Sequence, residues 1–142
     1  MFSLKIIVYF LIAFLSLHVF ATFYHLYWLF PWLDIPMHFL GGFLLVIIFF
    51  YFWRFAHISI GTGVSSVPNV FGALVLTLGF VALIGVFWEF YEFLHDFYLL
   101  TGGKISVFQS SFADTVKDLF FDLVGGTAAF AIFYKRFQTT NS

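Results

Sequence analysis

Four long apolar segments constrain the fold of this chain more than any other feature. They run from about Ile6 to Phe30, Met37 to Trp53, Val70 to Leu94 and Asp114 to Tyr134. A transmembrane helix takes roughly 17 to 25 predominantly apolar residues to cross the hydrocarbon core of a bilayer. Each segment reaches that length, so the sequence predicts an all-α, polytopic membrane protein that folds as a bundle of four transmembrane helices.

The composition excludes several other classes of protein. Of the 142 residues, 63% are hydrophobic and 9% are charged, which leaves too little polar surface to coat a water-soluble globule. We therefore expect residues 1–142 to form a single transmembrane domain in contact with the lipid bilayer. The net charge of -1 and the lack of a long basic run argue against a nucleic-acid partner. Without cysteine, the candidate metal ligands are His, Asp and Glu.

The positive charges indicate how the bundle lies in the membrane. With four spans, both termini and the second connection, residues 54–69, share one side. Four cations fall on that side and two on the other: Lys5, Arg54, Lys135 and Arg136 against Lys104 and Lys117. The positive-inside rule then predicts a multi-pass protein with both termini in the cytoplasm. We expect the first span to stay uncleaved, since its apolar run lacks a clear signal-peptide cleavage site.

The carboxylates are the main indication of function. All seven lie near an end of an apolar segment that this threading brings to the outer side: Asp34, Glu89, Glu92, Asp96, Asp114, Asp118 and Asp122. A charged group at membrane depth costs roughly 2.5 to 3.5 kcal/mol on insertion scales, so such residues usually mark a functional site. We therefore expect the seven acids to converge for a chemical reason.

The second span begins with two polar side chains on one face. Asp34 and His38 are four residues apart, which stacks them on the same side of a helix. An alternative role for Asp34 is to cap the helix from the preceding loop. The pattern D-x-x-x-[HD]-x-x-G-G occurs twice, at an offset of 84 residues, in Asp34, His38, Gly41 and Gly42 and in Asp118, Asp122, Gly125 and Gly126. Either chance or a parallel repeat of two helical hairpins explains this echo.

The third and fourth spans each carry a stripe of acids. By helical spacing, one face of the third span collects Gly85, Glu89, Glu92 and Asp96. Glu89 follows nearly twenty apolar residues, so we expect it to be the most buried of these acids. The fourth span places acids at i, i+4 and i+8, in Asp114, Asp118 and Asp122. Packing alone favours small or apolar residues there, which makes this the most specific motif in the sequence.

The excess of negative charge must be neutralised. Lys117 and Lys104 can each pair with one acid, which leaves five carboxylates. The protein can retain protons on some of them, pair them with His38, His25 or a tyrosine, or bind a divalent metal ion. For an ion of open identity, the predicted ligands are Asp34, His38, Glu89, Glu92, Asp118 and Asp122. His18, inside the first span, is expected to be hydrogen-bonded to a neighbouring helix instead.

Three motifs between Asp34 and Gly126 resemble those of a known family. D-x-x-x-H-x-x-G-G, W-E-x-x-E and D-T-x-x-D-x-x-x-D-x-x-G are similar to motifs of the YjdF-like bacterial inner-membrane proteins, whose function is unknown. The YjdF-like chains are usually longer and carry extra spans. VanZ-like membrane proteins are more distantly similar and tend to have Asn where this chain has Asp122. The resemblance implies an integral envelope protein and, for the VanZ-like branch, a link to glycopeptide antibiotic tolerance.

Two functional hypotheses follow, and the sequence leaves open whether the protein is an enzyme. In the first, the acids bind one or two divalent ions near the outer leaflet, and Glu89 and Asp118 act as catalytic residues in the hydrolysis of a lipid or lipid-linked substrate. In the second, the acids bind or transport a cation, a proton or an amine-bearing ligand, without catalysis. A structural role, in which the acids pair with basic helices of a partner, ranks below both. An oligomer is compatible with each hypothesis.

Overall fold

Helices make up almost all of the described structure. The computed structural model describes residues 3–60, 70–95, 97 and 111–141. Its helices are α1 (Leu4–Phe23), α2 (Leu26–Leu29), the 3-10 helix η1 (Pro31–Leu33), α3 (Asp34–Ile60), α4 (Val70–Leu94) and α5 (Phe112–Asn141). The predicted all-α fold class is confirmed.

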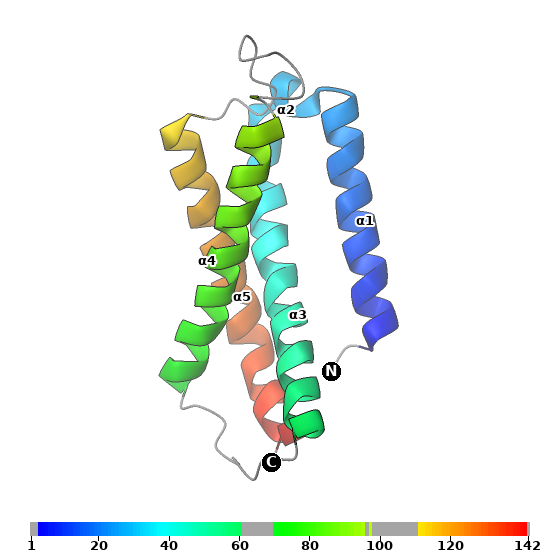
Figure 1. Cartoon of the computed structure of the whole chain (residues 1–142), viewed down its shortest axis with the longest axis vertical. Helices are drawn as coiled ribbons and strands as arrows, with labels where there is room; N and C mark the ends of the chain where they lie inside the picture. The colour runs from blue at the N-terminus through cyan, green and yellow to red at the C-terminus, as the bar shows by residue number, and fades with distance from the viewer. Residues whose placement is uncertain (1–2, 61–69, 96, 98–110, 142) are drawn as a thin grey trace.

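Three of these segments are long and apolar enough to cross a membrane. They are Leu4–Phe23, Pro31–Arg54 and Val70–Leu94. The fourth long helix, α5, has 30 residues, but its charged residues keep it from qualifying as a span by composition. It lies beside α3 along much of the bundle (Figure 1). The protein is thus an all-α membrane protein with three long apolar spans and a further C-terminal helix.

The long helices are packed unequally. In Figure 1, α3 and α5 run side by side in the same direction, and α4 runs the opposite way against both. Helix α1 stands to one side of these three and packs chiefly on α3. The start of α1 and the end of α5 lie at the same end of the bundle. We call the other end, where α3 and α5 begin, the acidic end.

The first span is shorter than predicted. Helix α1 ends at Phe23 rather than Phe30, because His25 adopts a left-handed backbone conformation with φ of 55°. An α-helix of L-residues does not continue through that conformation, so the chain turns into α2 and η1. Helix α3 then begins at Asp34, ahead of the predicted Met37. Pro36 falls in the first turn of α3, where its missing N–H sacrifices no helical hydrogen bond.

Glycines allow α3 and α5 to touch backbone to backbone. Gly42 faces the main-chain carbonyl of Asp122, and Gly125 faces that of Phe39. A Cβ atom at either glycine would overlap the carbonyl that it faces. In a bilayer, where dispersion replaces the hydrophobic effect as the force between helices, small residues commonly permit such close crossings. This crossing fixes Asp122 against α3 and so helps to build the acidic end.

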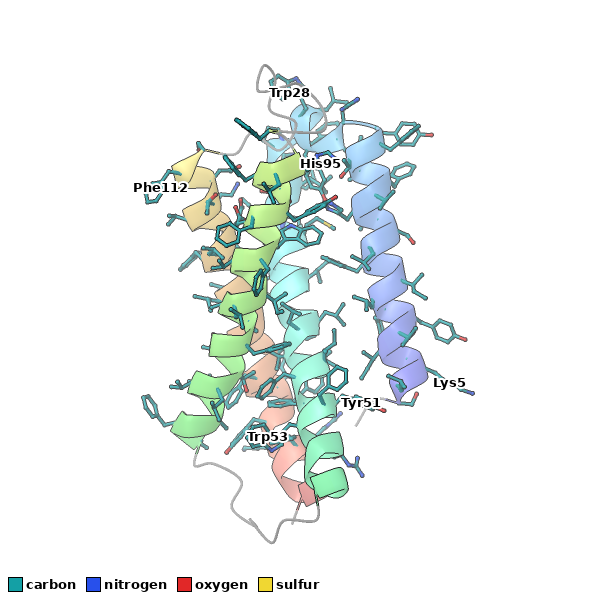
Figure 2. All side chains as sticks on the ribbon, viewed as in Figure 1. Lys5, Trp28, Tyr51, Trp53, His95 and Phe112 are labelled. Atoms are coloured by element: carbon teal, nitrogen blue, oxygen red, sulfur yellow. The ribbon has the colours of Figure 1, made fainter. Side chains whose placement is uncertain are left out.

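The two halves of the bundle differ in polarity. The half away from the acidic end is filled by one apolar cluster, which comprises Val46, Phe50, Ala73, Val81, Ala129, Phe130, Tyr134 and Phe137. Figure 2 shows Trp28 near the acidic end and Trp53 towards the opposite end. Tryptophan at both ends of a bundle is typical of the two membrane–water interfaces. Buried polar chemistry is therefore concentrated towards one interface.

Candidate functional site

His38 is the centre of the acidic cluster. We define this cluster as the side chains of Asp34, His38, Glu89, Glu92, Asp118 and Asp122. The Nε2 atom of His38 lies 3.4 Å from Asp34 Oδ1, and its Nδ1 atom lies 3.4 Å from Asp122 Oδ1. The imidazole is 5% exposed, so both contacts are shielded from solvent. Asp34 reaches His38 through the predicted four-residue spacing on α3, whereas Asp122 reaches it through the crossing with α5.

Lys117 lies at the rim of the cluster, in the first turns of α5. Its Nζ atom is 2.6 Å from Asp114 Oδ1, 3.3 Å from Asp118 Oδ1 and 3.4 Å from Asp34 Oδ2. The Ser111 hydroxyl accepts a hydrogen bond from the Asp114 N–H at 3.1 Å, which caps this end of α5. The prediction that Lys117 pairs with an acid is confirmed, and one ammonium group serves three carboxylates.

Two glutamates on α4 form the remaining side of the cluster. The buried residues of α4 share one face, which confirms the predicted stripe: Ala73, Thr77, Val81, Gly85, Glu89 and Glu92. The Trp88 indole N–H donates a hydrogen bond of 2.8 Å to Glu92 Oε1. Glu89 Oε1 is buried and has no hydrogen-bond partner in the part of the chain that the structure describes. Since buried polar atoms are rarely left unpaired, this oxygen is available to a hydrogen-bond donor or a cation.

The burial of the acids differs from the prediction. Glu89 is 9% exposed and Glu92 is 6% exposed, so the prediction that Glu89 is the most buried acid of its span is wrong. The bulky Trp88 side chain beside Glu92 accounts for part of that cover. Asp118, at 2%, is the most buried acid of the cluster. Asp96 and Lys104, which were also predicted to contribute, lie outside the described residues.

Two sets of ligand atoms are close enough together to hold a metal ion. In each set, one atom per residue lies within 4.8 Å of the others: Asp34, His38 and Asp118 in one, His38, Glu89 and Glu92 in the other. Imidazole nitrogen combined with carboxylate oxygen suits zinc, manganese or iron. Asp122 belongs to neither set but contacts His38, as the residues that orient a metal-binding histidine usually do. The structure thus brings all six predicted ligands together, five of them in these sets.

Comparison with known proteins gives the family of the chain. Residues 1–139 match the family described as predicted membrane protein, DUF2238. The chain belongs to this family. The match does not confirm the YjdF-like or VanZ-like resemblance, and no curated protein and no solved structure matches the chain. The function of this DUF2238 protein therefore has to be argued from its own cluster.

A cavity of about 150 Å³ lies beside the cluster of this DUF2238 protein and is partly open. Four cluster residues line it together with three other side chains that carry polar atoms: Asp34, His38, Glu92 and Asp122, with His18, Tyr27 and Trp88. Apolar side chains from α1, α3 and α4 form the rest of the lining. The cavity therefore connects the cluster to apolar space between these three helices.

His18, Tyr27 and Trp88 were not predicted to belong to the site. His18 Nδ1 lies 2.9 Å from the Tyr27 hydroxyl, and its ring centroid is 4.8 Å from that of Trp88. The predicted hydrogen bond of His18 is confirmed, although its partner lies just beyond the bend that follows α1. A histidine inside an apolar span was the available signal for this part of the site. His25, the other candidate on the predicted first span, is exposed at the bend.

Proposed function

We propose that the acidic cluster is an intramembrane site for a divalent metal ion and that it hydrolyses a lipid or lipid-linked substrate. The observation that carries this proposal is the pair of ligand sets that share His38. Two buried carboxylate oxygens, Glu89 Oε1 and Asp118 Oδ1, add support, because they have no hydrogen-bond partner within the described residues. The Lys117 ammonium lies 3.3 Å from Asp118 Oδ1 as an ion pair. A bound cation would satisfy both oxygens.

The balance of charge also favours a cation. Six carboxylates face Lys117 and His38 at the acidic end: Asp34, Glu89, Glu92, Asp114, Asp118 and Asp122. Even with His38 protonated, the negative charges outnumber the positive ones. Removing an uncompensated ion from water costs several kcal/mol. A divalent ion between the α3, α4 and α5 side chains would offset two of these charges.

Each residue of the site has its own role in the proposed hydrolysis. A divalent ion held there supplies Lewis-acid chemistry, which polarises a phosphoryl or carbonyl oxygen. Glu89, through the carboxylate oxygen that does not hold the ion, would accept a proton from the attacking water and return it to the leaving group. Asp118 is the second catalytic residue, and it belongs to the other ligand set that shares His38. Lys117, about one third exposed at the rim, is the cation placed to bind a phosphate group.

The proposal includes the placement of the protein in the membrane. Helix α5 serves as the fourth span, because the stretch from Leu123 to Tyr134 carries no charged residue. The whole chain then forms one transmembrane domain of the inner membrane, with both termini in the cytoplasm and the acidic cluster near the outer leaflet. The YjdF-like and VanZ-like resemblances, which imply an envelope protein, agree with this placement.

A second candidate function is binding of a cation or proton without catalysis. His38 lies between Asp34 and Asp122, an arrangement that can hold a shared positive charge without a metal. Transport through a single molecule is less compatible with the apolar cluster around Val46 and Phe130, which fills the other half of the bundle. The alternative is therefore binding from one side.

Metal analysis of the purified protein tests the site. We expect the wild type, stripped with a chelator and reloaded with zinc or manganese, to retain the metal in near-stoichiometric amount. Glu89→Gln and Asp118→Asn should each lose most of it, because each removes a charged ligand. Asp114→Asn is the matched control, since it makes the same change on the same helix outside both ligand sets. A stable wild type that retains no metal, or variants that retain all of it, would contradict the proposal.

Catalysis is tested separately from binding. The metal-loaded protein is incubated with a synthetic polyprenyl phosphate and a diacylglycerol phosphate, and the release of inorganic phosphate is measured. Release that requires the bound metal supports hydrolysis. Retention of metal without release from either substrate favours the binding alternative.

A further inference from the structure

Helix α1 is most buried near its two ends, and between them it reaches the bundle chiefly through the Phe14 side chain. Its buried residues are Ile7, His18 and Ala21. The stretch between Ile7 and His18 covers about three helical turns. Over this stretch the cavity lies between α1, α3 and α4, and the Phe14 ring crosses to Gly41 of α3. The α1 side chains that face the cavity there are Leu11, Phe14 and Leu15.

The cavity is mostly apolar and meets the acidic cluster at one end. At the acidic end its lining includes Asp34, His38 and Glu92. Away from that end it follows α3 from Gly41 to Ile48, which is about 10 Å along the helix axis. The side chains there are aliphatic and include Leu44 and Leu45 on α3 and Ile84 on α4. An apolar chain in this cavity would therefore have one end against the charged residues of the acidic cluster.

A bilayer supplies the occupant of such a cavity. An empty space beside α1 would cost its lining the dispersion contacts of close packing, and hydrocarbon chains are the molecules that surround a transmembrane helix. Cavities of about 150 Å³ bind one benzene-sized apolar group, so the volume of this one suits a short stretch of a single hydrocarbon chain. It is far too narrow for a helix of a partner protein, whose diameter is about 10 Å.

We propose that this cavity seats one hydrocarbon chain of a membrane lipid whose polar head group lies at the acidic cluster. The chain enters between α1 and α4, on the apolar side of the contact between His18 and Trp88. The inference rests on the proposed function and deepens it, since it describes how a lipid substrate would be held. It also assigns His18 and Trp88 to the boundary between head group and chain.

Photo-crosslinking in nanodiscs tests the seat of the chain. The probe is a phospholipid with a diazirine in one acyl chain, and labelled residues are located by peptide mass spectrometry. We expect labelling of Leu44, which is buried in the cavity wall, as well as of Leu40, which is 47% exposed on the same helix and reports on surrounding lipid. The ratio of Leu44 to Leu40 labelling therefore measures occupancy of the cavity.

One matched pair of substitutions on α1 provides the control. Leu15→Trp fills the cavity from its wall and should lower the ratio of Leu44 to Leu40 labelling several-fold. Leu17→Trp makes the same change at a residue of similar exposure outside the lining, 48% against 40% for Leu15, and should leave the ratio unchanged. An unlabelled Leu44 in the wild type, or equal ratios in the two variants, would overturn the proposal.

The metal content of the same samples separates the two proposals. Leu15→Trp should retain its metal, because Leu15 belongs to neither ligand set. Labelled Leu44 in a wild type that binds no metal would preserve the chain site and refute the metal centre. Bound metal with unlabelled Leu44 would support the metal centre and refute the chain site.

Discussion

The crossing of α3 and α5 is the feature whose perturbation tests the structure most directly. Gly42→Ala would drive a methyl group into the main-chain carbonyl of Asp122, and Gly125→Ala would drive one into that of Phe39. Both substitutions meet backbone rather than the end of a flexible side chain. No side-chain rotation can therefore relieve the overlap, and the helices have to move apart.

The structure sets the size of the expected loss. A carbon–oxygen contact needs about 3.3 Å, so each overlap forces the helices apart, and a gap of 0.5 to about 1 Å already forfeits a quarter to a half of the dispersion energy of the facing atoms. Overpacking typically costs about 1–3 kcal/mol, and we expect each variant in the upper half of that range. Gly42→Ala combined with Gly125→Ala should cost less than the sum, because both act on one crossing.

Thermal unfolding of the purified variants in one detergent measures these losses. Gly79→Ala is the control, because a Cβ atom at Gly79 meets nothing within 4 Å, and alanine is the better helix former by about 1 kcal/mol. We expect this variant to be as stable as the wild type or slightly more stable. If Gly42→Ala unfolds at the same temperature as Gly79→Ala, the close crossing of α3 and α5 is refuted.

Two further substitutions test the polar contacts of the site. Trp88→Phe removes the hydrogen bond to Glu92 and should lower the free energy of unfolding by about 1–3 kcal/mol. The control is Trp32→Phe, at a residue that is 64% exposed. An equal loss of stability in this control would contradict the reasoning. Lys117→Met leaves three carboxylates without their shared cation, so its melting temperature should fall at neutral pH. That loss should shrink as the pH falls and the carboxylates take up protons, whereas the exposed Lys135→Met should show no such trend.

The sequence predicted the helices best where a composition change marks their ends. The bounds of α4, Val70–Leu94, agree with the predicted span. The bend at His25 was missed, since neither glycine nor proline marks it and a left-handed histidine depends on its tertiary surroundings. The start of α3 was placed too late because Pro36 reads as the end of a connection, yet proline is tolerated in a first helical turn.

For the site, helical periodicity predicted which face of each helix carries the acids, but not which residues of other helices they contact. The spacing of Asp118 and Asp122 indicates one side of α5, but only the crossing with α3 decides that Asp122 contacts His38. The cavity was not predictable, because it depends on how far α1 stands from its neighbours. Trp88 and Glu92 are an exception, since their four-residue spacing was readable and their hydrogen bond follows from it.

The contacts at the crossing also bear on the echo in the sequence. The echo aligns Gly42 with Gly126, but the contacts make Gly42 the counterpart of Gly125. Gly125 of α5 meets the carbonyl of Phe39, which lies three residues before Gly42 on α3. Gly42 in turn meets the carbonyl of Asp122, which lies three residues before Gly125 on α5. The two parallel helices thus exchange equivalent contacts about a local two-fold axis, displaced by one residue from the alignment.

That local symmetry does not extend to the outer helices, and the difference has a chemical consequence. If the hairpins of α1 with α3 and α4 with α5 were equivalent, α1 would pack on α3 as closely as α4 packs on α5. Instead α4 packs closely and α1 stands off, with the cavity beside it. Gly126 lies against Leu78 and Val81 of α4, contacts that help to seal that side of the bundle. The place where the two hairpins differ is therefore where the acidic cluster becomes accessible to an amphiphile from the bilayer.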